Sequence, residues 1–304
     1  MVYKYLSIES KSAKPLAPVT DRTLKFALVP DLNDPFENLA KVTMDDTAFQ
    51  QQVERQKELM AKQPLFAKLP PEQRDAMVEQ AVSSLKADYD GTNHNISEFH
   101  HQRRVAHNTA QGVGVLSLTS SANNGLMWSH YTDRHQGYVL GFDDKHSWFH
   151  PPERAGEFLG RLRPVEYKDE RMELNSGIHS PEDAFRPFFR KSKDWIYEEE
   201  QRVLAPLKSP LIKKLTDSLY VREFPPEMLQ EVIFGCDMTE ENISKVKSSL
   251  KDATHVKYFR SMPSSVSYNV EIIPEGEYIG SSEEILKQAK ENAASLGIDV
   301  DKLL

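Results

Sequence analysis

The chain is 304 residues long, and its 38 Lys and Arg residues against 46 Asp and Glu give a formal net charge of −8. An acidic chain argues against broad electrostatic binding of nucleic acid, which requires a basic face. The single cysteine, Cys236, excludes an internal disulfide framework and a multi-cysteine metal site. No stretch approaches the roughly 18 apolar residues of a membrane span, and the first residues lack the apolar core of a signal peptide. We therefore expect a soluble, cytoplasmic protein that makes no membrane contact.

Short apolar stretches bounded by turn residues predict strands along the chain. The first covers residues 2–6, with Tyr3 and Tyr5 on one face, and the second covers residues 24–29. Residues 30–37 form a turn-rich loop in which Asn33, Asp34 and Pro35 favour an Asx turn. Further strands are predicted at residues 112–118, 137–142, 163–168, 197–204, 231–234, 255–259 and 268–273.

Residues 44–110 have helical character instead. Residues 46–62 have a helical composition, Pro70-Pro71-Glu72 is typical of a second helix start, and residues 96–108 predict a third helix. Shorter helices are expected at residues 124–131 and 181–189, at 240–250 after an N-cap at Thr239, and at 283–296.

This order predicts an α+β fold, because the strict strand–helix alternation of a parallel sheet is missing. We expect a mixed, largely antiparallel twisted sheet with a helical insertion and a C-terminal helix. The predicted organisation is a single α+β domain over residues 1–275, with the insertion at about 44–110, and a C-terminal helical tail over residues 276–304. Glycine-rich phosphate loops of the G-x-G-x-x-G or G-x-x-x-x-G-K-[ST] type do not occur, which disfavours Rossmann and P-loop nucleotide binding.

Three stretches mix polar and aromatic residues in a way that packing does not require. They are Asn-Asp-Pro-Phe-Glu at 33–37, Met-Trp-Ser-His-Tyr at 127–131 followed by His135-Gln136-Gly137, and the run from Trp195 to Arg202. Together with Tyr3-Lys4-Tyr5 and Phe234-Gly235, they resemble the bacterial family called domain of unknown function 2971. The resemblance covers about residues 1–260, and it implies a family without implying a reaction.

The run ending at Arg202 places two carboxylates close together. If residues 197–204 form a strand, then Glu198, Glu200 and Arg202 project from one face. One interpretation is a structural ion-pair network in which Arg202 offsets the two like charges. The other is a Glu-x-Glu pair in which the neighbouring charge raises the pKa of one carboxyl and suits it to acid–base work.

The same Glu-x-Glu strand also resembles the catalytic strand of ADP-ribosyltransferases. That resemblance implies a carboxylate that holds a ribose hydroxyl of NAD, and it implies Glu200 and Glu198 as the catalytic residues, with Glu200 at the centre. It also implies a Ser-Thr-Ser-like stretch, and the corresponding residues here are Ser117-Leu118-Thr119-Ser120. It further implies an Arg or His on the first strand, where this chain has Lys4 between two tyrosines. The predicted cofactor is NAD, with no metal, and the implied setting is a toxin or defence system. The residues predicted to bind the cofactor are Tyr3, Tyr5, Asn33, Ser117, Thr119, Trp128, His130, Tyr131 and Arg202.

Other interpretations stay open at this stage. Trp128 could be a core residue, or it could line a ligand slot with Tyr131 while His130 acts as a donor. The chain could be a non-catalytic binding or adaptor module, or a metal-dependent nuclease or phosphodiesterase that uses Asp34, His130, Glu198 and Glu200. A His- and Arg-rich segment, residues 94–107, could contact a protein or nucleic-acid acceptor. The predicted partner of the motifs is a small molecule or nucleotide, and we expect the motifs to converge on one pocket.

Overall fold

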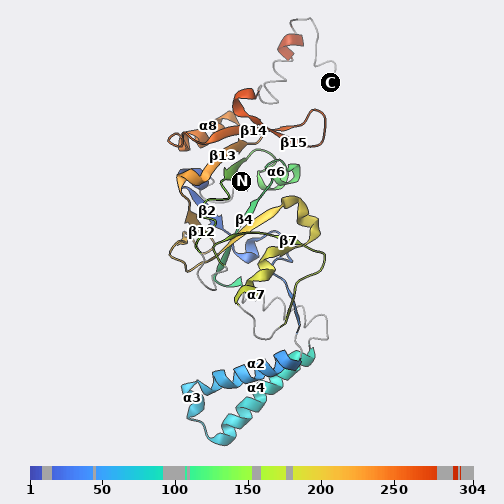
Figure 1. The fold of residues 1–304 in the computed structure, drawn as a ribbon, viewed down its shortest axis with the longest axis vertical. Helices are drawn as coiled ribbons and strands as arrows, with labels where there is room; N and C mark the ends of the chain where they lie inside the picture. The colour runs from blue at the N-terminus through green and yellow to red at the C-terminus, as the bar shows by residue number, and fades with distance from the viewer. Residues whose placement is uncertain are drawn as a thin grey trace.

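The computed structural model describes residues 1–8, 16–43, 46–91, 107, 110–152, 159–175, 181–278, 290–293 and 295. Its centre is an open mixed sheet of eight strands that are antiparallel at every junction except the one between β13 and β14 (Figure 1). In order across the sheet the strands are β15 (Val270–Pro274), β14 (Lys257–Pro263), β13 (Leu229–Phe234), β5 (Tyr138–Phe142), β1 (Val2–Leu6), β4 (Val113–Thr119), β10 (Glu200–Pro206) and β6 (Leu162–Pro164). The predicted α+β class and the largely antiparallel sheet are confirmed.

The parallel pair of strands is joined by helix α8 (Glu240–Ser249). Parallel neighbours need such a crossover, because a tight turn can join only antiparallel strands. Thr239 caps the helix, as predicted, and its side chain accepts a hydrogen bond from the backbone N–H of Asn242 over 3.3 Å. Ile243 and Val246 are buried against the sheet, so this end of the molecule is a compact helix-on-strand unit.

Strand β5 is buried on both faces and marks the middle of the core. Tyr138, Leu140 and Phe142 pack on the side that also receives α8, whereas Val139 packs on the opposite side. Helix α6 (Gly125–Tyr131) covers that second side, and its Trp128 packs among the same residues as Val139. The sheet therefore has a packed layer on each face near β1 and β5.

Smaller elements surround the main sheet. Ala27, directly after strand β2 (Thr23–Phe26), forms an isolated bridge with Val115 of β4. The smaller sheets are the three-stranded β11 (Lys213–Lys214), β12 (Tyr220–Glu223) and β2 (Thr23–Phe26), and the parallel pairs β3 (Lys41–Thr43) with β8 (Glu173–Asn175) and β7 (Glu166–Tyr167) with β9 (Arg190–Lys191). The short helices are α1 (Ala17–Thr20), α7 (Pro181–Phe185) and the 3₁₀ helices η1 (Val29–Asp31), η2 (Arg186–Phe189), η3 (Lys193–Glu198), η4 (Pro226–Met228) and η5 (Glu275–Glu277).

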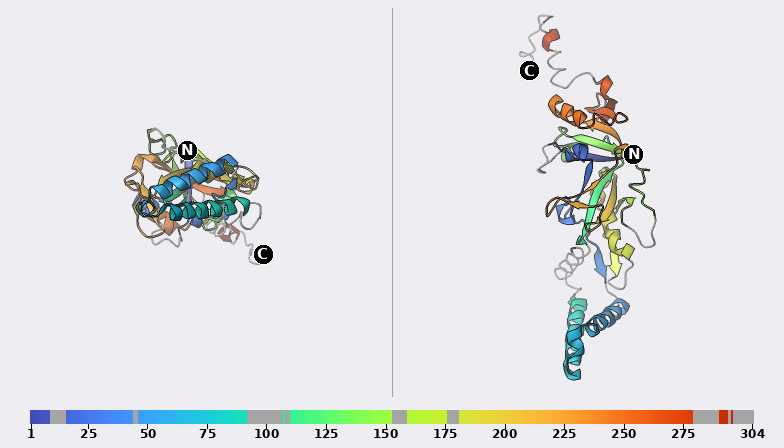
Figure 2. Two further views of the ribbon diagram at one scale, coloured as in Figure 1. Left: turned by 90° about the horizontal axis from the view of Figure 1, so that it is seen from below. Right: turned by 90° about the vertical axis from the view of Figure 1, so that its left-hand side faces the viewer.

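A helical hairpin stands at the end of the molecule opposite α8. It consists of α2 (Asp46–Ala61), α3 (Pro64–Ala67) and α4 (Pro71–Gly91), and Figures 1 and 2 show it extending away from the sheet. These helices occupy the first part of the predicted insertion. The predicted third helix and most of segment 94–107 lie outside the described residues, as does most of the predicted terminal helix, of which residues 290–293 are helical. Among the described residues, no helix has the length and apolar composition needed to cross a bilayer.

Candidate functional site

A cavity of about 280 Å³ opens where β1 separates from β4. The two strands pair only at Tyr3 and Thr119, whereas β1 remains paired with β5 along its whole length. Beyond that single pair, the Lys4 side chain bridges the opening, and its Nζ donates a hydrogen bond to the carbonyl oxygen of Ser117 over 2.8 Å. The divergence of β1 and β4 therefore creates the cavity. Lys4 provides a hydrogen bond to the Ser117 carbonyl, which β1 would otherwise reach through its backbone.

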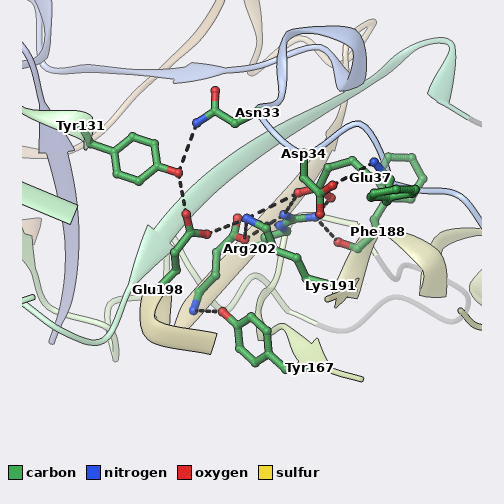
Figure 3. Close-up of polar contacts among 11 residues, drawn as sticks. Asn33, Asp34, Glu37, Tyr131, Tyr167, Phe188, Lys191, Glu198 and Arg202 are labelled. Atoms are coloured by element: carbon green, nitrogen blue, oxygen red, sulfur yellow. Dashed lines mark hydrogen bonds and ion pairs between the residues drawn. The ribbon is translucent and has the colours of Figure 1, made fainter. Parts of the chain in front are cut away.

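The guanidinium of Arg202 organises one wall of this cavity (Figure 3). Its Nε and Nη2 donate to the two carboxylate oxygens of Glu200 over 2.7 and 2.8 Å, and its Nη1 and Nη2 donate to those of Glu37 over 2.8 and 2.6 Å. The remaining N–H donates to the carbonyl oxygen of Phe188 over 2.6 Å. All five guanidinium donors are thus used, which is what a fully buried arginine requires.

Lys191 joins the same cluster from the neighbouring strand β9. Its Nζ lies 2.6 Å from Glu198 Oε2, 3.3 Å from Glu200 Oε2 and 3.6 Å from Glu37 Oε1, and it also lies over the Trp195 ring, 4.5 Å from the ring centroid. We call Glu37, Lys191, Glu198, Glu200 and Arg202 the buried ion cluster, because all five side chains are at most 5 % exposed. Three carboxylates therefore share two cations.

The electrostatics of the cluster favour charged forms. Burial raises the pKa of the Glu200 carboxyl, but the charge and hydrogen bonds of Arg202 and the charge of Lys191 outweigh burial and lower this pKa to about 2. Burial likewise lowers the pKa of Lys191, but the carboxylates of Glu200, Glu198 and Glu37 raise it above its ordinary value. Glu200 is consequently ionised at neutral pH and Lys191 is protonated.

A hydrogen-bonded chain connects the cluster to the cavity mouth. Asn33 Nδ2 donates to the Tyr131 hydroxyl over 3.2 Å, and this hydroxyl donates to Glu198 Oε1 over 2.5 Å. Burial, together with the hydrogen bond to Glu198, raises the pKa of Tyr131 well above its usual value, so the hydroxyl keeps its proton. Figure 3 shows Asn33, Tyr131 and Glu198 in line, although they come from a loop, from α6 and from η3.

The local structure around Glu198 differs from the prediction. The expected strand at 197–204 begins only at Glu200, because residues 193–198 form the 3₁₀ helix η3, whose start is capped by the Ser192 side chain. Glu199 then adopts a left-handed conformation with φ of 41° and turns the chain into β10. Strand alternation therefore explains the shared face of Glu200 and Arg202, whereas Glu198 reaches the cluster from a helical turn.

Most of the predicted site residues meet at the cavity. The predicted residues that line it are Tyr3, Tyr5, Asn33, Ser117, Thr119, Tyr131, Glu198, Glu200 and Arg202. Strands β4 and β10 bring several of them together, since Glu200 pairs with Thr119 and Arg202 with Ser117. Motifs dispersed along the chain therefore contribute to one concave surface.

Trp128 and His130, which were also predicted to bind the cofactor, do not line this cavity. Trp128 is fully buried, its Nε1 donates to the Ala122 carbonyl over 2.9 Å, and its ring packs against Tyr5 at 5.3 Å between centroids. His130 is exposed on the outer side of α6. Met127 and Tyr131 line the cavity instead, because residues four apart share a helix face and their neighbours in sequence do not.

The residues predicted to form the site did not include Lys4, Glu37 or Lys191. Lysines are common in this chain, and Lys191 belongs to no spacing pattern that indicates chemistry, whereas Lys4 stands in the Tyr3-Lys4-Tyr5 motif without a predicted role. The Asn-Asp-Pro-Phe-Glu motif did carry a signal, because its loop supplies both Asn33 and Glu37. Asp34 fixes that loop by accepting the backbone N–H of Phe36 over 2.9 Å, as an Asx turn does.

Among the residues that the structure describes, no group of three or more His, Cys, Asp or Glu side chains has the geometry to hold a metal ion. Lys191 and Arg202 pair with the three carboxylates that come together here, so the cluster has one more acidic than basic side chain. The side chains that line the cavity offer carboxylates, hydroxyl groups, lysine amines and a guanidinium.

Comparison with known proteins gives a similarity to one family over part of the chain, and it gives no reaction. Residues 127–203 match the family model described as Protein of unknown function (DUF2971), and this confirms the family resemblance over that segment. The matched segment runs from α6 to β10, so it includes Tyr131, the carboxylate pair and Arg202, all of which line the cavity. Neither the curated proteins nor the solved structures with which the chain was compared gave a match.

Proposed function

From the resemblance of the Glu-x-Glu segment at Glu198 and Glu200 to the catalytic strand of ADP-ribosyltransferases, we propose that the chain is an NAD-dependent enzyme of that type. The cavity between β1 and β4 would hold the nicotinamide–ribose half of NAD. One observation carries the proposal: residues predicted from that resemblance, far apart in sequence, line a single cavity in which the ionised Glu200 lies beside Glu198. Its volume of about 280 Å³ suits a fragment of this size, at the lower end of small-molecule sites.

The carboxylates fit the charge that the reaction develops. Breaking the bond between ribose and nicotinamide leaves positive charge on the sugar, and fixed negative charge beside it stabilises the transition state. Glu200 already accepts hydrogen bonds of 2.7 and 2.8 Å from Arg202 and one of 3.3 Å from Lys191, whereas each oxygen of Glu198 accepts one. Glu198 therefore has more free capacity to accept a ribose hydroxyl, and we assign it that contact. Glu200 would supply charge and hold Arg202 and Lys191 in position.

The test is a comparison of two glutamate variants. Glu198→Gln keeps the size of the side chain but removes its charge, and it should lower NAD consumption by about 10²-fold or more, the scale for losing a positioned acid–base or electrostatic group. Glu241→Gln on the exposed face of α8 is the matched control and should consume NAD like the wild-type protein. NAD consumption is measured by chromatography of the products, with circular dichroism as the check of folding.

Two outcomes would reject the proposal in favour of its rivals. A wild-type protein that neither binds nor consumes NAD would support a binding or adaptor module, in which the buried ion cluster serves only the fold. Activity on nucleic acid that disappears in EDTA would support the metal-dependent nuclease or phosphodiesterase instead.

A further inference from the structure

Lys4, a partly buried lysine of the cavity, differs from the buried Lys191. Its Nζ donates to a neutral acceptor, the Ser117 carbonyl, and it forms no ion pair within the described part of the chain. Lys191, in contrast, has three carboxylates within 4 Å. A hydrogen bond to a carbonyl orients an amine without requiring it to be charged, so Lys4 can keep this contact after losing a proton.

The surroundings of Lys4 increase the unprotonated fraction of its amine. Burial in the opening between β1 and β4 lowers its pKa to about 8, and the positive charge of Lys25 on β2 acts in the same direction. Glu200 on β10 and Glu198 at the end of η3 raise this pKa, but they do not overcome burial. At pH 7.5 about one quarter of such an amine is unprotonated, compared with about one in a thousand for an ordinary exposed lysine.

We propose that Lys4 is a nucleophilic amine that captures small aldehydes and ketones entering the cavity. The lone pair of Nζ forms a bond to the carbonyl carbon, the carbonyl π electrons move to its oxygen, and a proton passes from nitrogen to oxygen to give a carbinolamine. Loss of the hydroxyl group and of the second nitrogen proton as water leaves the imine, so amine and carbonyl compound give imine and water. The site goes beyond the proposed NAD chemistry and needs no turnover of NAD.

The cavity limits which carbonyl compounds reach the amine. Its volume of about 280 Å³ admits a compound of several carbon atoms, and its polar lining includes the Tyr131 hydroxyl and the Glu198 carboxylate. A hydroxylated aldehyde would find hydrogen-bond partners there, in contrast to a long apolar aldehyde. The expected ligand class is thus a short, hydroxylated carbonyl compound.

Reductive trapping tests the proposal on the full-length, native protein. Glycolaldehyde and sodium cyanoborohydride are added at pH 7.5 for short times, and the modified lysines are identified by peptide mass spectrometry. Lys4 should be modified at least about 10-fold faster than Lys213, an exposed lysine on β11. In urea-unfolded protein the two rates should become similar. Lys4→Arg keeps the positive charge and a donor for Ser117 and should remove only the Lys4 adduct.

Equal rates for Lys4 and Lys213 in the native protein would overturn the proposal, as would a Lys4 preference that persists after unfolding. The pH profile gives a second criterion: the Lys4 rate should level off above about pH 8, whereas the Lys213 rate should continue to rise. This experiment separates the proposal from the enzyme function, because trapping at Lys4 can succeed in a protein that never consumes NAD, and it can fail in one that does.

Discussion

Glu200 shows how strongly a single residue can be held in one protonation state. Its carboxylate contacts two cations inside the protein, and its pKa of about 2 lies below the ordinary value of 4.5. The contact contributes stability that is fully present above about pH 4.5, and this stability is lost as the pH falls from there toward 2. Acid sensitivity in this window therefore reports on the buried ion cluster.

Replacing Glu200 by Gln should remove this acid sensitivity. The variant should be less stable than the wild type at pH 7, because Arg202 and Lys191 lose a charged partner. Between pH 4.5 and 2 the wild type should lose about 3 kcal/mol more of its unfolding free energy than the variant loses. Urea unfolding followed by circular dichroism at a series of pH values measures the difference, with Glu241→Gln as the control. Parallel pH profiles for wild type and Glu200→Gln would contradict the prediction.

Individual contacts of the site were harder to foresee than its location. The side chain of Trp128 carries an apolar ring and one donor, which suits a core position next to the Ala122 carbonyl as well as a ligand slot. Lys191 looked like any other charged residue, because its role depends on three carboxylates brought together from distant segments. Local patterns indicate which motifs matter, and only the folded chain decides which atoms face the cavity.

Among the elements, the loop between α6 and β5 is fixed against the end of β13 by two glycines. The backbone N–H of Gly235 donates to the carbonyl of Gly137 over 2.9 Å, and a Cβ added at Gly235 would collide with the carbonyl oxygen of His135. A Cβ at Gly137 would similarly collide with the carbonyl oxygen of Leu6. These contacts explain why the His-x-Gly and Phe-Gly motifs occur together: their backbones touch beside β1.

Substituting Gly235 by Ala should therefore destabilise the protein by about 2–4 kcal/mol, since backbone atoms on both sides must move to make room. Gly276→Ala is the matched control, because no atom lies within 4 Å of a Cβ at that position. Denaturant unfolding of both variants measures the difference. A Gly235→Ala protein as stable as Gly276→Ala would show that the backbone around His135 and Gly235 has room for a Cβ atom.

The boundaries of helices and strands were predicted correctly where a local sequence signal marked them. Thr239 marks the start of α8 because its hydroxyl satisfies a free backbone N–H, and this preference is local. The expected strand from Tyr197 failed because alternation of apolar and polar residues over a few positions also fits a 3₁₀ turn. Glycine and asparagine are the residues typical of a left-handed backbone, and position 199 is a glutamate instead. The turn between η3 and β10 therefore carried no sequence signal.

At the scale of the whole molecule, the helices of the α2–α4 hairpin pack mainly against one another. Val53 and Met60 are buried within it, whereas Leu59, Leu65 and Met77 remain at least 44 % exposed. In Figures 1 and 2 it projects from the end opposite α8. Its helices were predictable from composition and periodicity, but their direction relative to the sheet depends on tertiary packing that periodicity does not describe.

Replacing residues 46–91 by a short glycine–serine linker should leave the sheet and the cavity intact. The shortened protein should keep its near-ultraviolet circular dichroism per tryptophan, because Trp128, Trp148 and Trp195 all lie outside the hairpin. Lys4 should also retain its faster trapping by glycolaldehyde relative to Lys213. An aggregated product, or one in which Lys4 and Lys213 react equally, would show that the hairpin supports the core.

The central position of β1 has a consequence for the order of events during protein synthesis. This strand leaves the ribosome before its partners, yet it lies between β4 and β5, and Lys4 pairs with Leu140. Until those partners have been translated, its apolar residues have no sheet to join and are open to chaperones or to aggregation. The cavity is completed later still, after Arg202 has been translated and its guanidinium can donate hydrogen bonds to the carboxylate of Glu37. A stalled or truncated nascent chain that ends before Arg202 would therefore lack β10 and the arginine partner of Glu37, and quality-control proteases should clear it readily.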